Sequence, residues 1–303
     1  MLNKVIASVI PFFPRKFIWL FSRRYIAGET LADAVRVSKE LNDEGIEVTL
    51  DLLGEFQTSE DKIGFYKSEY LKAIEAVEKN GLKASFSVKP TMFGLLIDKE
   101  SCYRHIRDII LLASGCGRMV RIDMEDSHCT TLEIELFRKL QNEFPQHVGL
   151  VFQAYLHRTL DDLKGLSNLN INGTNVNIRL CKGIYVESGD IAYKNRNEIN
   201  NHFTEDLDYL FRNDFFAAIA THDKLLVNKA YDLIEKYCVS NDHYEFQMLY
   251  GVTPELRKSI VEAGHHMRVY VPFGKDWMNY STRRLKENPR MVSHIIKALF
   301  VRM

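Results

Sequence analysis

RVYVPFGKDWMNYSTRRLKEN, residues 268–288, predicts a strand, a loop and a helix that carries two adjacent arginines. The β-branched and aromatic run at residues 269–271 favours a strand. Pro272 and Gly274 are typical of the turn that ends a strand, so the residues after them begin a new element. This strand is the last of a regular series, and the series decides the fold.

Seven earlier runs of the same kind precede it, and helical patterns separate them. The runs are VTLDLLGE from Val48, ASFSVKP from Ala84, MVRIDMED from Met119, VGLVFQAY from Val148, VNIRLCKG from Val176, FAAIATHD from Phe216 and YEFQMLYG from Tyr244. Strands that alternate with helices imply parallel pairing. Eight such units that close on themselves form a (β/α)8 barrel, for which ~250 residues is a usual size.

We therefore predict an α/β protein with a TIM-type barrel over residues 46–303. Residues 1–45 are expected to form extra N-terminal helices packed outside the barrel. An open doubly wound sheet is the alternative, because the same alternation permits it. That fold would need a phosphate-binding loop after an early strand. The nearest match, Gly115-Cys116-Gly117, lacks a third glycine and precedes a strand, so the dinucleotide fingerprint is not met.

Composition narrows the classes of function. The 303 residues include 40 lysines and arginines and 40 aspartates and glutamates, and the pI is about 7.1. No overall charge attracts nucleic acid, so binding to DNA or RNA is disfavoured. The five cysteines are scattered and form no CxxC pair, which favours a reducing compartment. Histidines and carboxylates lack metal-ligand spacing, so we predict no metal site.

Residues 5–21, VIASVIPFFPRKFIWLF, form the most apolar stretch of the chain. Two prolines, Arg15 and Lys16 interrupt it, so no run approaches the ~18 apolar residues of a membrane span. Two interpretations remain open. The segment is either a helix packed on the outside of the domain or a peripheral contact whose apolar side chains enter the membrane interface.

Tyr280, Arg283, Arg284 and Glu287 share one side of the final predicted helix, because they are spaced three, four and seven residues apart. Two neighbouring guanidinium groups are rigid, permanently charged donors whose geometry matches a carboxylate, and Glu287 would orient them. A solvated helix face with one surface ion pair fits the same residues. The segment alone leaves both interpretations open.

In a barrel of this type the working residues lie at the C-terminal ends of the strands and in the loops that follow. Those ends are polar here, with Lys89, Asp123, Glu125, Gln153, Tyr155, Arg179, Lys182, Tyr185, Thr221, His222, Gln247 and Tyr270. Burying so many polar groups at one mouth would be costly without a ligand, which predicts an anion-binding site. Lys89 or Lys182 could instead form a Schiff base, so an aldolase-type barrel remains an alternative.

Eight ordered motifs, which run from the second predicted strand to the helix after the last one, resemble those of the proline dehydrogenase family. They are SVKP at 87–90, IDMED at 122–126, VFQAY at 151–155, RLCKGIYVES at 179–188, ATHD at 220–223, EFQMLYG at 245–251, YVPFG at 270–274 and YSTRRLKEN at 280–288. The resemblance runs from about residue 25 to residue 290. It implies a distorted (β/α)8 barrel with FAD across the strand ends and L-proline beneath the last helix.

The resemblance implies a monofunctional, FAD-dependent proline dehydrogenase, since no aldehyde dehydrogenase half follows. L-proline would be oxidised to 1-pyrroline-5-carboxylate by hydride transfer to FAD, and the electrons would pass to a membrane quinone. This is the first step in the degradation of proline to glutamate. The expected location is the cytoplasm, with residues 5–21 as the candidate contact on the inner face of the membrane. A non-catalytic sensor that binds proline through the arginine pair is a third hypothesis.

The same resemblance implies roles for single residues. The catalytic residues would be Asp123, Arg179 and Tyr270. Proline would contact Lys89, Leu249, Tyr270, Tyr280, Arg283, Arg284 and Glu287, with Lys89 and the arginine pair on its carboxylate. FAD would contact Met124, Gln153, Arg179, Lys182, Gly183, Ile184, Thr221 and His222. Arg179 would lie near flavin N5 and stabilise the reduced flavin by its charge.

Two positions depart from the family pattern, and a third selects the substrate. Ile184 stands where alanine is frequent, and Asp223 stands where asparagine is common. Both bear on the orientation of the cofactor and not on the reaction class. Tyr270 stands where hydroxyproline-preferring relatives carry a smaller residue. A ring hydroxyl would crowd this phenol, so proline is the expected substrate.

Replacing Arg284 by lysine tests the predicted carboxylate clamp, that is, Lys89, Arg283 and Arg284 together with the supporting Glu287. Arg284→Lys keeps the positive charge and removes the planar fork. We expect the protein to keep its flavin while the KM for L-proline rises severely, on the order of tenfold or more. Steady-state kinetics and the absorbance spectrum of the purified variant measure the two properties. An unchanged KM would favour the surface-helix interpretation.

Overall fold

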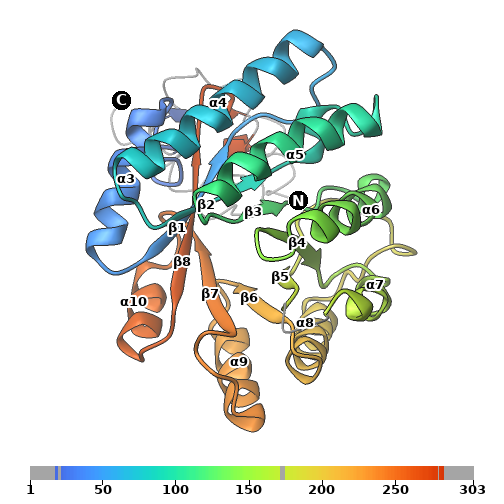
Figure 1. Cartoon of the computed structure of the whole chain (residues 1–303). Helices are drawn as coiled ribbons and strands as arrows, with labels where there is room; N and C mark the ends of the chain where they lie inside the picture. Colours follow the sequence, from blue (N-terminus) through green and yellow to red (C-terminus); the bar gives the residue numbers. More distant parts are fainter. Residues whose placement is uncertain (1–17, 20–21, 171–174, 279, 283–303) are drawn as a thin grey trace, which may run out of the picture.

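Eight parallel strands close into a barrel in the order in which they occur in the chain (Figure 1). The computed structural model describes residues 18–19, 22–170, 175–278 and 280–282. The strands are β1 (Glu47–Leu52), β2 (Ala84–Val88), β3 (Val120–Ile122), β4 (Val148–Gln153), β5 (Asn177–Cys181), β6 (Phe216–Ala220), β7 (Tyr244–Leu249) and β8 (Met267–Phe273). Parallel pairing of β8 with β1 closes the barrel. The predicted (β/α)8 fold is confirmed, and the open doubly wound sheet is wrong.

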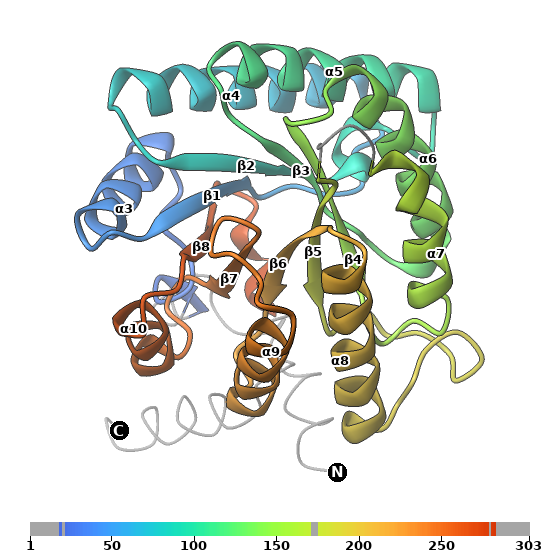
Figure 2. The ribbon, with the colours of Figure 1, turned by 60° about the horizontal axis from the view of Figure 1, so that its bottom comes forward.

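Helices cover the outside of the barrel and connect consecutive strands (Figure 2). They are α4 (Glu60–Lys79), α5 (Lys99–Gly115), α6 (Ser127–Glu143), α7 (Thr159–Leu166), α8 (Arg196–Arg212), α9 (Lys224–Tyr237) and α10 (Pro254–Glu262), with short 3-10 turns η2 (Pro90–Phe93) and η3 (Ser167–Leu169). The side chains of Asp98, Asp126, Asn195 and Asp223 accept backbone N–H groups at the starts of α5, α6, α8 and α9. These caps satisfy donors that a helix leaves free at its N-terminus.

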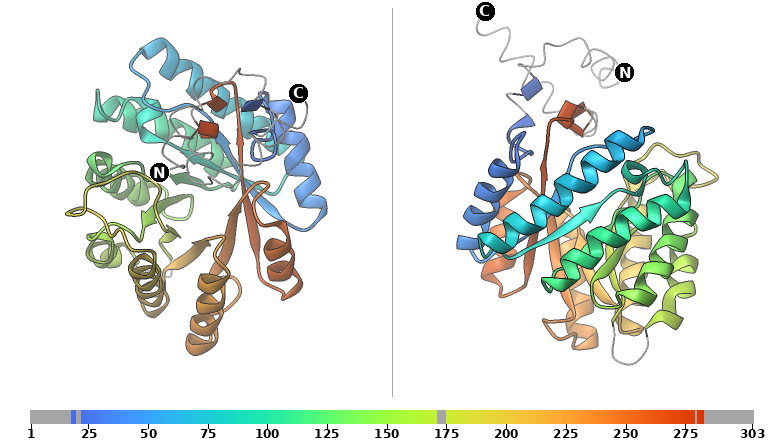
Figure 3. Two further views of the ribbon diagram at one scale, coloured as in Figure 1. Left: turned by 180° about the vertical axis from the view of Figure 1, so that it is seen from behind. Right: turned by 45° about the horizontal axis from the view of Figure 1, so that its top comes forward.

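A further helix, α3 (Leu31–Asp43), precedes the barrel and packs against β1 and β8 (Figure 1; from behind in Figure 3). Thr30 and Asp33 form a capping box at its start. Its buried face carries Ala34, Val37 and Leu41. This helix lies within the region predicted to hold N-terminal helices, and the division of the chain at residue 45 stays a prediction.

Most of the apolar segment 5–21 lies outside the described residues, so both interpretations of it stand. The described Trp19 packs against Trp277, which follows β8, with 4.8 Å between the ring centroids. The start of the described chain therefore contacts the segment after the last strand. Within the ranges that the structure describes, no helix has the length and apolar character needed to cross a membrane.

The interior of the barrel is polar, although barrels of this type are usually filled by branched apolar side chains. Arg121 of β3 is fully buried, and its Nη2 donates to Asn177 Oδ1 at 2.6 Å. Gly149 of β4 makes room for this arginine, because a Cβ there would lie 2.8 Å from Arg121 Nη1 and 2.9 Å from the Asn177 carbonyl oxygen. Arg268 of β8 binds Glu245 of β7 at 2.8 Å. Buried charge is therefore built into the barrel itself.

The pKa values of two aspartates of α8 are shifted in opposite directions, because only one of the two has cationic partners. Asp206 is buried, and its Oδ2 has no hydrogen-bond partner among the described residues. Burial raises the pKa of Asp206 to about 8, so the folded protein keeps it protonated at pH 7. Asp208 contacts Lys236, Arg212 and Tyr237. Burial favours its protonation, but Tyr237 and the cations outweigh this and lower the pKa of Asp208.

Asp206→Asn is expected to stabilise the protein at about pH 9 and to change little at about pH 4. Between the ordinary aspartate pKa and the raised one, the folded protein holds one proton more than the unfolded chain. Wild-type stability therefore falls as pH rises through this window, by up to about 1.4 kcal/mol per pH unit. Asparagine removes this titration. Chemical denaturation at a series of pH values measures the difference.

The matched control is Asp208→Asn on the same helix. Because the pKa of Asp208 is lowered, its carboxylate stabilises the folded protein above the ordinary aspartate pKa, and this stabilisation is lost in acid. The control should therefore lose stability at neutral pH. A variant Asp206→Asn with the same pH profile as the wild type would contradict the prediction.

Candidate active site

A cavity of about 550 Å³ opens at the C-terminal ends of the strands. The described residues that were assigned to catalysis, proline binding or FAD binding all line it, namely Lys89, Asp123, Met124, Gln153, Arg179, Lys182, Gly183, Ile184, Thr221, His222, Leu249, Tyr270 and Tyr280. Parallel strands explain this convergence, because their carboxyl ends all meet at the same mouth of the barrel. The volume lies in the range of sites for small molecules and cofactors.

The structure describes only residues 280–282 of the predicted helix that carries the arginine pair. Arg283, Arg284 and Glu287 lie outside the described residues, so their roles stay predictions. Tyr280 is 6% exposed and lines the cavity. The described start of this segment therefore reaches the site through Tyr280.

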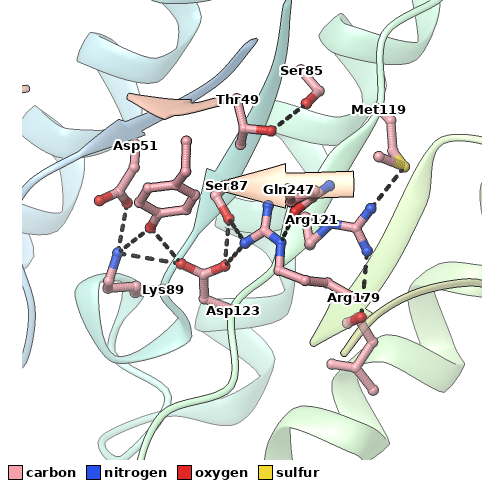
Figure 4. Close-up of polar contacts among 12 residues, drawn as sticks. Thr49, Asp51, Ser85, Ser87, Lys89, Met119, Arg121, Asp123, Arg179 and Gln247 are labelled. Carbon is pink, nitrogen blue, oxygen red and sulfur yellow. Dashed lines mark hydrogen bonds and ion pairs between the residues drawn. The ribbon is translucent and has the colours of Figure 1, made fainter. Parts of the chain in front are cut away.

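Lys89 follows β2 and lies between two buried carboxylates (Figure 4). Its Nζ is 2.6 Å from Asp51 Oδ1 and 3.4 Å from Asp123 Oδ2. The hydroxyl of Tyr270 links the set, because it accepts from Lys89 Nζ at 3.1 Å and donates to Asp123 Oδ2 at 2.8 Å. Groups from β1, β8 and the loops after β2 and β3 thus form one hydrogen-bonded cluster.

Pairing keeps these groups charged although they are buried. Burial lowers the pKa of Lys89, but Asp51 and the neighbouring anionic groups outweigh it and hold that pKa well above its usual range. Burial likewise favours protonated Asp123, but Lys89 and Arg179 reverse this and lower the pKa of Asp123. Burial raises the pKa of Asp51 to about 6, which leaves this group ionised at pH 7. Burial and Asp123 raise the pKa of Tyr270, which keeps its proton.

Arg179 of β5 extends the cluster across the barrel (Figure 4). Its Nη1 donates to Asp123 Oδ1 at 2.9 Å and to Ser87 Oγ at 3.3 Å. Its Nε donates to Gln247 Oε1 at 2.5 Å. The remaining nitrogen, Nη2, is buried and has no hydrogen-bond partner in the part of the chain that the structure describes. Such a donor is costly to bury, so it marks a place where an acceptor on a ligand belongs.

Two cations stand at the rim of the cavity, and Asp223 binds both. Its Oδ2 is 2.7 Å from Lys182 Nζ and 2.8 Å from Arg196 Nη2. Burial favours protonated Asp223, but Lys182 and Arg196 outweigh it and lower this pKa. Arg196 lines the cavity and was missed by the sequence analysis, because it lies on α8, beyond the loop after β5. No motif in the sequence distinguishes it from a surface arginine.

Backbone groups orient two of the predicted cofactor residues. His222 Nε2 accepts the N–H of Leu249 at 2.9 Å, so the neutral ring carries its proton on Nδ1. Gln153 Nε2 donates to the carbonyl oxygen of Glu125 at 2.8 Å. These bonds tie β4 and β6 to their neighbours at the mouth of the barrel.

Asp51 was also missed by the sequence analysis. It lies inside β1, where a single acidic residue in an apolar run gives little signal of a site. Glu125, in contrast, was expected at the mouth but does not line the cavity. Its buried carboxylate accepts from Thr91 N at 3.0 Å and Thr91 Oγ1 at 2.5 Å, and burial raises its pKa to about 7. Through these bonds to Thr91, Glu125 stabilises η2, the turn directly after Lys89.

The closed barrel and the charged cavity at its strand ends define a (β/α)8-barrel protein of the kind that carries its active site in the loops after the strands. The described residues contain no group of three histidine, cysteine, aspartate or glutamate side chains that could hold a metal ion. The family model for proline dehydrogenase matches residues 34–297, so the chain belongs to the proline dehydrogenase family. The predicted family is confirmed.

Individual relatives agree with this assignment. The chain is 35% identical over 280 residues to proline dehydrogenase 1 of Bacillus subtilis subsp. natto. The match covers 92% of this chain and 91% of that protein. The chain is 32% identical over 289 residues to the proline dehydrogenase of Deinococcus radiodurans, with 94% and 92% covered. The expected likeness to monofunctional members is confirmed by this coverage.

A solved structure of a longer protein contains the same barrel. Proline utilization A (PutA) from Bdellovibrio bacteriovorus, inactivated by N-propargylglycine, matches with a TM-score of 0.82 and 28% identity. The match covers 88% of this chain and 32% of that chain, so the present chain spans about a third of it. The likeness therefore extends over most of this chain.

Asp51→Asn is expected to lower the free energy of unfolding by about 3–5 kcal/mol, because it leaves the buried Lys89 ammonium short of its nearest anion. The double variant Asp51→Asn/Lys89→Met should recover part of this loss, since the pair is then removed as a whole. Chemical denaturation of the wild type, both single variants and the double variant gives the coupling energy. Losses that simply add would show that the two residues do not act as a pair.

Proposed function

We propose that this member of the family oxidises L-proline to 1-pyrroline-5-carboxylate with FAD as the hydride acceptor. The observation that carries the proposal is Arg179 Nη2, a buried donor with no partner among the described residues, in the same cavity as charged Lys89. Lys89 suits a carboxylate, and Arg179 suits a group on which negative charge develops. One cavity therefore provides for both an anionic substrate and an electron acceptor.

The residues present fit a flavin nucleotide. Lys182 and Arg196 supply two cations at the rim, where phosphate groups would be stabilised. At Gly183, φ is +102° and a Cβ would lie 2.1 Å from Tyr155 Cδ1, so the backbone there takes a course that only glycine allows. Cations at the rim and a buried donor inside match a ligand with phosphates at one end and a ring system at the other.

FAD, when bound, would take up the hydride that leaves the ring carbon of proline beside its nitrogen. Arg179 would direct Nη2 at FAD and supply positive charge without reorganisation of the site. Asp123 would keep Arg179 in place through the contact at 2.9 Å. The other residues proposed to contact FAD are Met124, Gln153, Lys182, Gly183, Ile184, Thr221 and His222.

Lys89 would bind the carboxylate of proline, because its ammonium is held charged at the wall of the cavity. Arg283, Arg284 and Glu287 are proposed to complete this clamp. Tyr270, Tyr280 and Leu249 would pack against the pyrrolidine ring. The Tyr270 hydroxyl already accepts from Lys89 and donates to Asp123. A hydroxyl on the substrate ring would therefore crowd Tyr270 without gaining a hydrogen bond from it.

A Schiff-base aldolase fits the geometry less well. A lysine nucleophile must be present as a neutral amine. The pKa of Lys89 is held well above its usual range, and Lys182 is paired with Asp223 at 2.7 Å. A proline sensor would share the binding groups, but it would have no need for a buried donor beside them.

We further propose a membrane quinone as the acceptor of the electrons and the cytoplasm as the location. Residues 5–21 would provide a peripheral contact with the inner face of the membrane. Support comes from the apolar character of that segment, which suits an interfacial helix close to a lipid-soluble acceptor.

Anaerobic addition of L-proline to the FAD-loaded protein should abolish the flavin absorbance, and a soluble quinone should restore it. D-proline, with the same groups in mirror arrangement, is the matched control and should leave the colour unchanged. Retained colour after L-proline would favour the sensor. A protein that cannot be reconstituted with FAD, and that borohydride traps at Lys89 or Lys182, would favour the aldolase.

A further inference from the structure

Gln247 of β7 carries a buried amide that contacts Arg179 (Figure 4) and, on its other side, Glu245 of the same strand. Its Oε1 accepts from Arg179 Nε at 2.5 Å, and its Nε2 donates to Glu245 Oε1 at 2.5 Å. A guanidinium can only donate, and a carboxylate can only accept. The two partners therefore leave the amide a single orientation.

Glu245, which accepts from this amide, is itself held in place by Arg268. Arg268 Nε lies 2.8 Å and 3.0 Å from its two carboxylate oxygens, and Arg268 is itself tied to Glu47 at 2.5 Å. Burial favours protonated Glu245, but Arg268 and Arg121 outweigh it and lower its pKa, so the group is ionised. The hold on Gln247 thus comes from an anchored anion.

Gln247 also completes the restraint on Arg179. Asp123 and Ser87 hold Nη1, and Gln247 holds Nε. A planar group that is fixed at two of its three nitrogens cannot rotate, so the position of the third is determined. The third nitrogen is Nη2, the buried donor that has no partner among the described residues.

We propose that Gln247 is a positioning residue that aims Arg179 Nη2 at FAD and preserves its positive charge there. This inference rests on the proposed function. A neutral amide can connect Arg179 to the anchored Glu245 without neutralising the arginine. A carboxylate at the same place would pair with the guanidinium and lie against Glu245, at the expense of the charge that Arg179 presents to the cofactor. The expected effect is on the reduction potential of the bound flavin.

Gln247→Met keeps the length of the side chain and removes both hydrogen bonds. In the purified holoprotein we expect an about tenfold lower equilibrium constant for two-electron reduction of the flavin, which corresponds to a potential about 30 mV more negative. Gln247→Glu should lower the potential further, because it adds a carboxylate beside Arg179. Flavin content and thermal stability are measured for each variant. If Gln247→Met does not fold, the nearly isosteric Gln247→Glu decides by the same measurement.

The matched control is Gln141→Met on α6, another buried glutamine, whose Nε2 donates to the Pro145 carbonyl oxygen at 3.0 Å. It does not line the cavity and should leave the potential unchanged. A double-mutant cycle separates positioning from packing. In an Arg179→Met background, Gln247→Met should no longer shift the potential, because the group it orients is gone.

Two results would overturn the inference. One is a flavin-loaded Gln247→Met protein with the wild-type potential. The other is a shift of equal size with and without Arg179, which would show that Gln247 acts on the flavin by itself. Either result leaves the proposed function intact as long as the wild-type flavin is bleached by L-proline. A wild-type protein that binds no FAD would instead refute the proposed function and this inference with it.

Discussion

Opposite charges are paired inside this barrel, and the shape of the cavity depends on that pairing. Lys89 and Arg179 are each 6% exposed, Asp123 is 9% exposed and Asp51 is fully buried. Any one of these groups would be costly to bury alone, and each is stable because its partner is held within 2.6 to 3.4 Å. The four groups come from β1, from β5 and from the loops after β2 and β3. Their pairing therefore holds these strands and loops in fixed positions relative to one another.

The charged groups beneath the cavity also need partners. An apolar filling, usual in barrels of this type, would offer nothing to hold Arg179 from beneath. Here Gln247 provides that hold and transmits it from Glu245 and Arg268. Arg121 is a different case, since its bonds go to Asn177 and to backbone oxygens, and burial lowers its pKa well below the usual range. It stays in place because a glycine on the neighbouring strand leaves space for it.

The barrel and most of the described site could be predicted from the sequence because both follow from local patterns. Alternation of strands and helices determines the topology, and parallel strands bring polar residues at their ends to one mouth, as for Lys89 and Asp123. Asp51 could not be found in this way, because its partner lies 38 residues away and no local pattern encodes such a pair. Arg196 was missed for a related reason, since its contact with Asp223 depends on how α8 and α9 start beside each other.

Asp223, where the resemblance led us to expect asparagine, has a specific role at the rim of the cavity. Its Oδ1 accepts the N–H of Leu225 and caps α9, while its Oδ2 binds both Lys182 and Arg196. Both oxygens must therefore accept hydrogen bonds. An asparagine that capped the helix through its oxygen would turn its NH₂ group toward two cations, and it would bring no charge to hold them. The carboxylate thus fixes the cations as a pair, at the cost of one negative charge where the phosphates of a nucleotide would bind. A ligand that pairs with Lys182 and Arg196 has to share them with Asp223, so the aspartate keeps the rim ordered and limits how tightly it holds an anion.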